Sequence, residues 1–287
     1  METGGVDLHI HTTASDGSLT PSQVVEAAAR MKISALAITD HDNLSGISEA
    51  LKTGERLGIE VVPGLEISTE EGKEEIHILG YFVDYQAGWL NKLVNGLQKK
   101  REERIRKILI KLANLGVYLQ EDDVREVAGK GSLGRPHVAK VLLNKGYVSS
   151  ISEAFRRYLG NYAPAYVPRQ HITAAQAVSI IRKAQGVAVL AHPGFIKDER
   201  RITELFGLGI QGIECWHSEQ DGDISRKYVK LARRHGLVVT GGSDFHGRQF
   251  GSNRQLGKPR VDEVVYEELR AFYLGMRAKE VNYKLGS

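Results

Sequence analysis

Short apolar runs alternate with amphipathic stretches along the first third of the chain. Four runs have the length and composition of buried strands: residues 6–10 (VDLHI), 33–40 (ISALAITD), 59–68 (IEVVPGLEIS) and 74–84 (EEIHILGYFVD). The stretches 20–31 and 44–58 between them have apolar positions at helical spacing. Thr20 followed by Pro21 favours a helix start, and Gly58 favours a helix end. This alternation predicts βα units around a largely parallel sheet.

The strand signal nearly disappears between about residue 89 and about residue 169. The segment 97–116 is strongly amphipathic, with basic residues opposite an apolar stripe, and three shorter helices are predicted within 120–129, 135–146 and 150–160. A stretch of this length exceeds an ordinary loop. We therefore predict a barrel domain made of residues 1–88 and 170–287, interrupted by a helical subdomain at 89–169 that covers the substrate.

The βα rhythm then resumes and continues to about residue 247. Helices are predicted at 173–186, 199–209 and 223–236, and strands at 187–193, 210–217 and 237–247. The total of about seven strands suits one α/β barrel domain in a chain of 287 residues. The last forty residues indicate a loop and a terminal helix, without chemistry that the sequence supports.

Composition narrows the class of protein only moderately. A net charge of +4 permits an anionic substrate but does not require nucleic acid. The basic positions between Lys99 and Lys107 are interleaved with Glu102 and Glu103, which favours a solvated helix face over an RNA-binding surface. The sequence has one cysteine, and we find no signal peptide and no apolar run long enough to span a membrane. We therefore expect a cytoplasmic protein that does not bind a membrane, and no protein partner is evident.

Histidines and carboxylates gather on the predicted strands, mostly at their ends. His9 and His11 lie two residues apart, so on a strand they share one face. Nine such residues form the candidate metal ligands: His9, His11, Asp16, His41, Glu66, His77, His192, Asp244 and His246. The carboxyl ends of barrel strands carry active sites, and imidazole with carboxylate suits Mn, Fe or Zn. We expect two or three divalent ions that activate hydroxide for phosphoester hydrolysis.

The motifs HIHTTASDGSLTP, AITDHDN, GLEIS, HILGYF, AHPG and GSDFHG together resemble the polymerase and histidinol phosphatase (PHP) superfamily. The resemblance implies a distorted (β/α)7 TIM-like barrel and three ions. It assigns one ion to His9, His11, Glu66 and Asp244. A second ion falls to Glu66, His77 and His192, and a third to Asp16, His41 and His246.

The inserted motifs GRPHVA and APAYVPR resemble a narrower bacterial subgroup that acts on nucleoside monophosphates or 3′,5′-bisphosphates. Arg135 and His137 of the first motif are expected to bind the substrate phosphate. The alternative is a plain helix N-terminus with Pro136 at its first position and a surface histidine. His217 is expected to contact the substrate or its leaving group.

Three further carboxylates are expected near the ligands. Asp40 and Glu214 are expected behind them, where they orient imidazoles. For Asp42 we favour capping of a helix that begins near Leu44.

These features predict a metal-dependent phosphomonoesterase acting on nucleotides of the AMP or 3′,5′-bisphosphate type. One alternative is a 5′-3′ exoribonuclease on short RNA, which the same metals would serve. Histidinol phosphatase is another alternative. A non-catalytic metal-binding module is the alternative outside enzymes.

Overall fold

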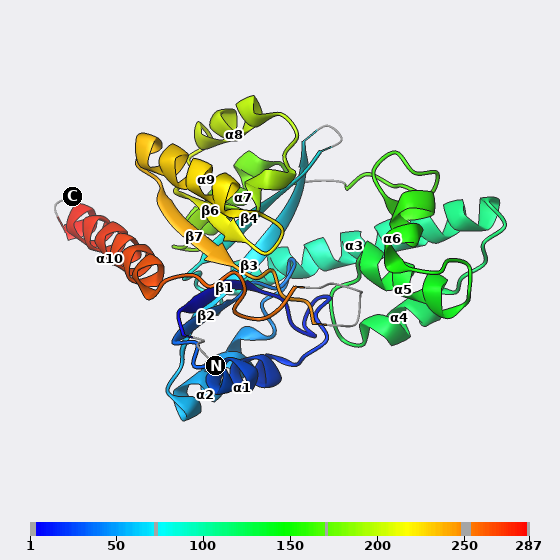
Figure 1. Cartoon of the computed structure of the whole chain (residues 1–287), viewed down its shortest axis with the longest axis horizontal. Coiled ribbons are helices and arrows are strands. Elements are labelled where there is room, and N and C mark those ends of the chain that lie inside the picture. Colours follow the sequence, from blue (N-terminus) through cyan, green and yellow to red (C-terminus); the bar gives the residue numbers. More distant parts are fainter. Residues whose placement is uncertain (1–3, 72–73, 170–171, 248–253, 286–287) are drawn as a thin grey trace.

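The computed structural model describes residues 4–71, 74–169, 172–247 and 254–285 (Figure 1). Its seven strands are β1 (Val6–Ile10), β2 (Ala35–Ile38), β3 (Glu60–Glu71), β4 (Glu74–Tyr81), β5 (Val187–Leu190), β6 (Gly212–His217) and β7 (Val238–Gly242). They form one sheet in sequence order. A parallel bridge between Ile10 and Phe245, just beyond β7, brings the sheet edges together. The expected seven-stranded α/β barrel is therefore confirmed.

One strand departs from the expected parallel arrangement. β4 pairs antiparallel with both β3 and β5, while the other neighbours are parallel. Only two residues separate β3 from β4, and a parallel crossover needs many more. Glu66 also does not end its strand, because β3 continues to Glu71 in this hairpin. Ser68 pairs with His77 and Glu66 with Leu79, so all four side chains lie on one face.

Helices cover the outside of the barrel, as expected of βα units. They are α1 (Pro21–Arg30), α2 (Ile47–Leu57), α7 (Ala174–Lys183), α8 (Glu199–Phe206) and α9 (Gly222–His235). Thr20 accepts from the backbone of Gln23 in a capping box, with Pro21 in the first turn. Gly58 ends α2 in the left-handed conformation, at φ 68°. Both helix boundaries are therefore confirmed.

Alternating residues of most strands divide the barrel core into two clusters; β1 departs from this alternation at an irregularity between Asp7 and Ile10. On β4, Ile76 and Ile78 pack with the helices, whereas Leu79 and Tyr81 pack with the helix α10 (Glu263–Leu285). Glu66 and His77 share the face of Leu79. The helices α1, α2, α7, α8 and α9 pack on the other face, so these polar residues point into the barrel.

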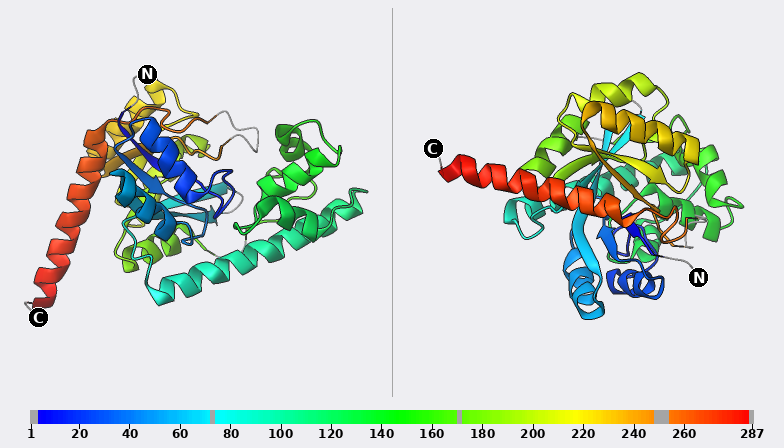
Figure 2. Two further views of the ribbon diagram at one scale, coloured as in Figure 1. Left: turned by 90° about the horizontal axis from the view of Figure 1, so that it is seen from below. Right: turned by 60° about the vertical axis from the view of Figure 1, so that its left-hand side comes forward.

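The insertion has a hydrophobic core of its own. It consists of α3 (Gly88–Asn114), α4 (Glu121–Ala128), α5 (Arg135–Asn144), α6 (Ile151–Ala154) and a π-helical turn, Phe155–Leu159. Ile105, Leu112 and Val138 belong to a cluster separate from the two barrel clusters. In Figure 2, α3 runs from the barrel to the smaller helices, and α10 extends away from the barrel. The boundaries at residues 89 and 169 stay a prediction.

Within the described residues, every helix is too short or too polar to cross a bilayer.

Candidate metal-dependent active site

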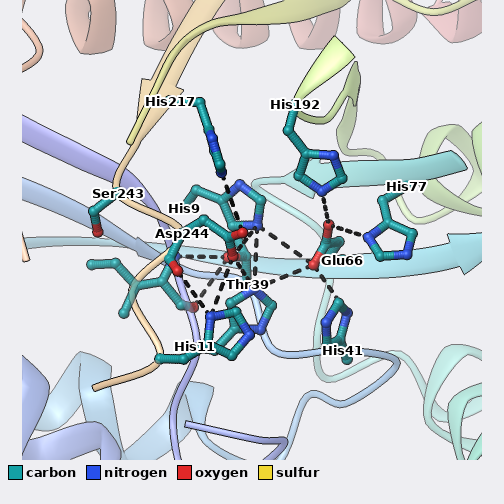
Figure 3. Close-up of polar contacts among 12 residues, drawn as sticks. His9, His11, Thr39, His41, Glu66, His77, His192, His217, Ser243 and Asp244 are labelled. Carbon is teal, nitrogen blue, oxygen red and sulfur yellow. Dashed lines mark hydrogen bonds and ion pairs between the residues drawn. The ribbon is translucent and has the colours of Figure 1, made fainter. Parts of the chain in front are cut away.

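All nine candidate ligands converge at one end of the barrel, around the carboxylate of Glu66. Glu66 Oε1 lies 2.8 Å from His77 Nδ1 and 3.1 Å from His192 Nε2. Glu66 Oε2 lies 3.0 Å from His41 Nδ1 and 3.2 Å from His11 Nε2. Figure 3 shows His41, His77 and His192 directed at this carboxylate. Glu66 therefore has the position of a bridging ligand.

Asp244 and Asp16 complete the cluster on the side of β1. Asp244 Oδ1 lies 3.1 Å from His11 Nε2 and 3.4 Å from His9 Nε2. Asp16 Oδ1 lies 3.4 Å from His246 Nε2, and Asp16 Oδ2 lies 3.9 Å from His41 Nε2. Asp244 and His192 have positive φ angles, 50° and 28°, which non-glycine residues rarely adopt. Such local strain is typical of functional sites.

Among the residues that the structure describes, three groups of donor atoms are compact enough to hold an ion, with atoms within 4.8 Å of one another. They are His9, His11 and Asp244; His11, Asp16, His41 and His246; and His41, Glu66 and His77. These groups overlap the three sets implied by the family resemblance, but His11 and His41 each belong to two of the groups. The assignment of each ligand to an ion stays a prediction.

The carboxylates of the cluster are held ionised, whereas its imidazoles are shifted in both directions. Burial raises the pKa of Glu66, but the imidazoles of His41, His77 and His9 outweigh it and hold that pKa well below its usual range. Burial lowers the pKa of His41 to about 4 and also lowers that of His77. Burial lowers the pKa of His9 too, but the carboxylates of Glu214, Asp244 and Glu66 outweigh it and hold that pKa well above its usual range. Ionised carboxylates and neutral imidazoles are the forms that coordinate metals.

Unpartnered buried atoms indicate the same chemistry. Among the described residues, Glu66 Oε2, Asp16 Oδ1 and His77 Nε2 are buried without a hydrogen bond of good geometry, although imidazole nitrogens lie 3.0 Å from Glu66 Oε2 and 3.4 Å from Asp16 Oδ1. Unpaired buried polar atoms are rare because they are costly. A divalent ion beside these atoms would remove that cost.

A layer of carboxylates lies behind the candidate ligands. Glu214 is fully buried; its Oε1 is 2.9 Å from His9 Nδ1, and its Oε2 accepts from the His192 backbone at 2.6 Å. Asp40 accepts from the Thr12 backbone and from Ser15 Oγ at 2.6 Å. The Ser15 hydroxyl in turn lies 3.5 Å from His11 Nδ1. Both carboxylates therefore support ligand positions, directly or through one hydroxyl.

The interpretation of Asp42 as a helix cap was wrong. α2 begins only at Ile47, with Gly46 at its N-cap. Asp42 instead accepts from Arg101 Nε at 2.6 Å and from the Ser68 backbone at 3.2 Å. A buried guanidinium 59 residues away therefore determines its position.

The three expected substrate residues lie in different surroundings. His217 is fully buried, and its Nδ1 accepts a hydrogen bond from the Glu219 backbone. The proton of the ring is therefore on Nε2, which lies 3.2 Å from Asp244 Oδ2. His137 is buried at the start of α5 and accepts from the Gly134 backbone at 3.0 Å, so the alternative of a surface histidine was wrong. Arg135 donates to Glu75 Oε2 at 2.6 Å. Their contact with substrate stays a prediction.

Comparisons with known proteins agree with this geometry. A sequence model described as the PHP domain matches residues 7–162. The chain belongs to the PHP domain family. The expected class, a metal-dependent phosphoesterase and hence a phosphoric ester hydrolase, is confirmed.

Similar PHP proteins span nearly the whole chain. The 3′,5′-nucleoside bisphosphate phosphatase of Chromobacterium violaceum is 34% identical over 277 residues, covering 93% of this chain and 96% of its own. The 5′-3′ exoribonuclease Rnm of Escherichia coli is 35% identical over 250 residues, or 84% of each chain. A solved structure from C. violaceum, described as an amidohydrolase with bound sulfate and no metal, has a TM-score of 0.82 at 33% identity. That match covers 93% of this chain and 96% of the other.

The PHP site opens into a cleft of about 720 Å³ between barrel and insertion. Pro136, Asn161 and Tyr162 line it from the insertion side. Tyr162 is 72% exposed, and Phe195, on the barrel side of the cleft, is 44% exposed. Phe195 also lies 5.1 Å from the His192 ring, centroid to centroid. The cleft thus joins a metal-binding floor to exposed aromatic rings.

Three basic residues of this cleft were missed by the sequence analysis: Lys197, Arg201 and Arg254. Arg254 Nη1 donates to Asp244 Oδ2, and its Nη2 donates to Glu219 Oε1 at 2.6 Å. No periodic pattern or motif surrounds Arg254; only its closeness to GSDFHG could have drawn attention to it.

Proposed function

We propose that this PHP protein hydrolyses phosphomonoesters of nucleotides, of the AMP or 3′,5′-bisphosphate type. The observation that carries the proposal is the convergence of nine imidazole and carboxylate side chains, seven of which line a cleft with exposed aromatic residues, while His9 and His11 lie buried beneath it. A cleft of about 720 Å³ lies within the range that holds small ligands.

The proposed metal ligands are the nine residues named above, in two or three sites for Mn, Fe or Zn. Glu66 would bridge neighbouring sites, since its two oxygens face different imidazoles. Bound ions of this kind polarise phosphoryl oxygens and make water a stronger nucleophile near neutral pH. Glu214 would hold His9 and the His192 backbone in ligating geometry.

Other side chains of the cleft would bind and orient the substrate. Arg254 is held against Asp244 at the edge of the cluster, where it would contact a phosphate oxygen. His217 would act behind Asp244 as a positioning residue, because it is fully buried. Arg135 and His137 are proposed on the insertion side, where Arg135 would exchange Glu75 for a substrate phosphate.

The aromatic rings of the cleft favour a nucleotide as the substrate rather than a smaller phosphate ester. Phe195 and Tyr162 present exposed faces to the cleft, and bases stack on such faces with little sequence preference. The relative from C. violaceum is named for a nucleoside bisphosphate, which agrees with this choice.

The 5′-3′ exoribonuclease activity is the second candidate, favoured by the 35% identity to the exoribonuclease of E. coli and by basic residues beside the cleft on α3. Both reactions would use the same metal centre. Histidinol phosphatase and a non-catalytic metal-binding module have no such support. Substrate is the only proposed partner, and cytoplasm is the proposed compartment because the chain has a single buried cysteine.

A substrate panel tests this proposal. Purified protein with Mn²⁺ is incubated with AMP, 3′,5′-bisphosphoadenosine, histidinol phosphate and a 5′-phosphorylated short RNA. We expect inorganic phosphate from the adenine nucleotides, with kcat/KM at least about tenfold above that for histidinol phosphate. Mononucleotides released from RNA, without phosphate from AMP or the bisphosphate, would replace the phosphatase by the nuclease. Turnover of histidinol phosphate alone, or of no substrate, would refute both.

A further inference from the structure

A second, smaller pocket lies beside the cleft, between α3 and the segment after residue 166. Its cavity is about 50 Å³, enough for a single small group but not for a nucleoside. Five cationic side chains line it, Lys100, Arg101, Arg104, Lys107 and Arg169, against two anionic ones, Asp42 and Glu103. We call it the arginine pocket, after Arg101, Arg104 and Arg169.

Arg104 has unused hydrogen-bonding capacity in this pocket. The residue is only 9% exposed, and its Nε donates to the Val167 carbonyl at 2.8 Å. Its Nη2 has no hydrogen-bond partner among the described residues and lies 3.5 Å from Glu75 Oε1. Burial, together with Arg169 and Arg135, lowers the pKa of Arg104 to about 9. A buried guanidinium without a full set of acceptors is costly.

Glu75 does not supply enough negative charge to balance this region. Its Oε2 accepts from Arg135 Nη2 at 2.6 Å, and its Oε1 accepts from Arg169 Nε at 3.1 Å. Arg104 lies against the same oxygen. One carboxylate therefore serves three guanidinium groups, which leaves an excess of positive charge that a bound anion would balance.

The guanidinium of Arg101 already donates hydrogen bonds to three protein acceptors, so it lines the pocket in a fixed position. It donates to Asp42 Oδ2 at 2.6 Å, to Ser68 Oγ at 2.9 Å and to the Leu133 carbonyl at 3.4 Å. Counting only hydrogen bonds among the described residues, the groups available to a ligand are Arg104 Nη2, the rest of the Arg169 guanidinium and the ammonium groups of Lys100 and Lys107. The two lysines are exposed on α3, so an anion can enter from solvent.

The arginine pocket lies close to the candidate metal ligands at Ser68 and close to the cleft at Glu75. Ser68 Oγ contacts Arg101 Nη2 at 2.9 Å on one side and His41 Nδ1 at 3.3 Å on the other. Glu75 lines the cleft while binding the pocket's Arg169. A ligand that spans the cleft therefore passes close to the pocket.

We propose that the arginine pocket binds a phosphate group, through Arg104, Arg169 and the two lysines. Arginine forks match phosphate oxygens, and lysines add charge at the mouth. The phosphate has two sources: a second phosphate of a substrate whose first phosphate lies at the metals, or a free phosphate ion. The first source rests on the proposed function, whereas the second does not.

Binding of inorganic phosphate to chelator-treated protein tests the pocket without catalysis. Isothermal titration is done on the wild type and on Arg104→Met, which keeps the length of the side chain but removes its donors. We expect the Kd for phosphate to rise about tenfold or more in the variant. The control is Lys99→Ala, an exposed lysine of α3 outside the pocket, which should bind as the wild type does. No saturable binding to the wild type, or an equal Kd in Arg104→Met, would overturn the proposal.

The double variant Lys100→Ala, Lys107→Ala covers the case in which Arg104→Met does not fold, since both lysines are exposed. It should weaken phosphate binding about threefold to tenfold, and unchanged binding would count against the pocket. If the substrate supplies the phosphate, this variant lowers the ratio of kcat/KM for bisphosphate to kcat/KM for AMP about tenfold, and Lys99→Ala does not.

An unchanged ratio with weakened phosphate binding identifies the free ion as the ligand. Phosphate binding that depends on Arg104, in a protein that hydrolyses no nucleotide, would refute the proposed function and leave the pocket intact.

Discussion

At the residue scale, Glu66 is the side chain on which the metal centre depends most. Its carboxylate is 1% exposed and lies within 3.4 Å of five imidazoles: His9, His11, His41, His77 and His192. Six histidines crowded without counter-charge would repel one another once protonated. The position of Glu66 therefore serves both the metal-free and the metal-bound protein.

Replacing this carboxylate tests its role as a bridge. Glu66→Gln keeps the shape of the side chain but removes the charge, so we expect loss of at least one bound ion and a fall in kcat/KM of about a hundredfold or more. Elemental analysis of protein reconstituted with Mn²⁺ counts the ions. Glu26→Gln, an exposed glutamate paired with Arg56, is the matched control. Unchanged metal content in Glu66→Gln would contradict the bridging role.

Phe195 carries a separate prediction about substrate selection. Its exposed ring borders the cleft beside His192, where a base can stack. Phe195→Ala should lower kcat/KM for AMP about tenfold to a hundredfold, since stacking is worth ~1–3 kcal/mol. The kcat/KM for ribose 5-phosphate, which has no base, should change much less.

Leu208→Ala, an exposed apolar residue outside the cleft lining, should change neither value. An equal loss for AMP and ribose 5-phosphate would remove Phe195 from base recognition.

At the element scale, the β3–β4 hairpin connects the barrel to the insertion. β3 extends beyond Glu66, and its continuation carries Glu70, which accepts from the Tyr166 hydroxyl at 2.9 Å and the Arg169 backbone at 2.6 Å. On β4, Glu75 pairs with Arg135 of α5. These carboxylates hold helices of the insertion over the cleft, so the hairpin sets the shape of the substrate site.

This connection predicts a measurable dependence of stability on Glu75 and on pH. Burial raises the pKa of Glu75, but Arg169 and Arg135 outweigh it and hold that pKa well below its ordinary value of 4.5. A depressed pKa in the folded state means that the stabilisation is complete above pH 4.5 and is lost as the pH falls through the lower folded-state value.

Glu75→Gln should lower the free energy of unfolding near neutral pH by about 3 kcal/mol, because it leaves buried arginines unpaired. Urea unfolding measures this loss, and the difference from wild type should shrink at about pH 3. Glu74→Gln on the same strand, whose partner Arg201 is 36% exposed, should cost less than about 1 kcal/mol. A pH-independent difference for Glu75→Gln would contradict this account.

At the scale of the whole molecule, metal binding and folding should be coupled. The ligands come from segments between His9 and His246, so a bound ion would join residues that follow the first strand of the sheet to residues that follow the last. The unfolded chain lacks this arrangement, and ions that bind only the folded state stabilise it. Metal removal should therefore affect the entire barrel rather than one loop.

Addition of Mn²⁺ to chelator-treated protein should raise Tm by several degrees. At a free Mn²⁺ concentration a hundredfold above Kd, binding stabilises the folded state by ~2.7 kcal/mol, which corresponds to a shift of this size. Differential scanning calorimetry measures the shift, and activity should return with it. Glu66→Gln should show a smaller shift under the same conditions. Equal Tm values with and without metal would argue against a structural link between the ligand segments.

The sequence by itself determined the features that depend on near neighbours and on the order of elements. Strand periodicity placed His9 and His11 on one face, Thr20 and Gly58 marked helix boundaries, and the order of strands implied a barrel with a common rim. Only the tertiary structure decided the direction of β4, the pairing of Asp42 with Arg101, the contact of Arg254 with Asp244 and the charge balance around Arg104. The Asp42–Arg101 pair and the surroundings of Arg104 join residues far apart in the chain, and no local pattern encodes such distances because they arise from packing of the insertion against the barrel. The direction of β4 depends on the extension of β3 to Glu71, which leaves only two residues for the connection, and the Arg254–Asp244 contact depends on packing beyond β7.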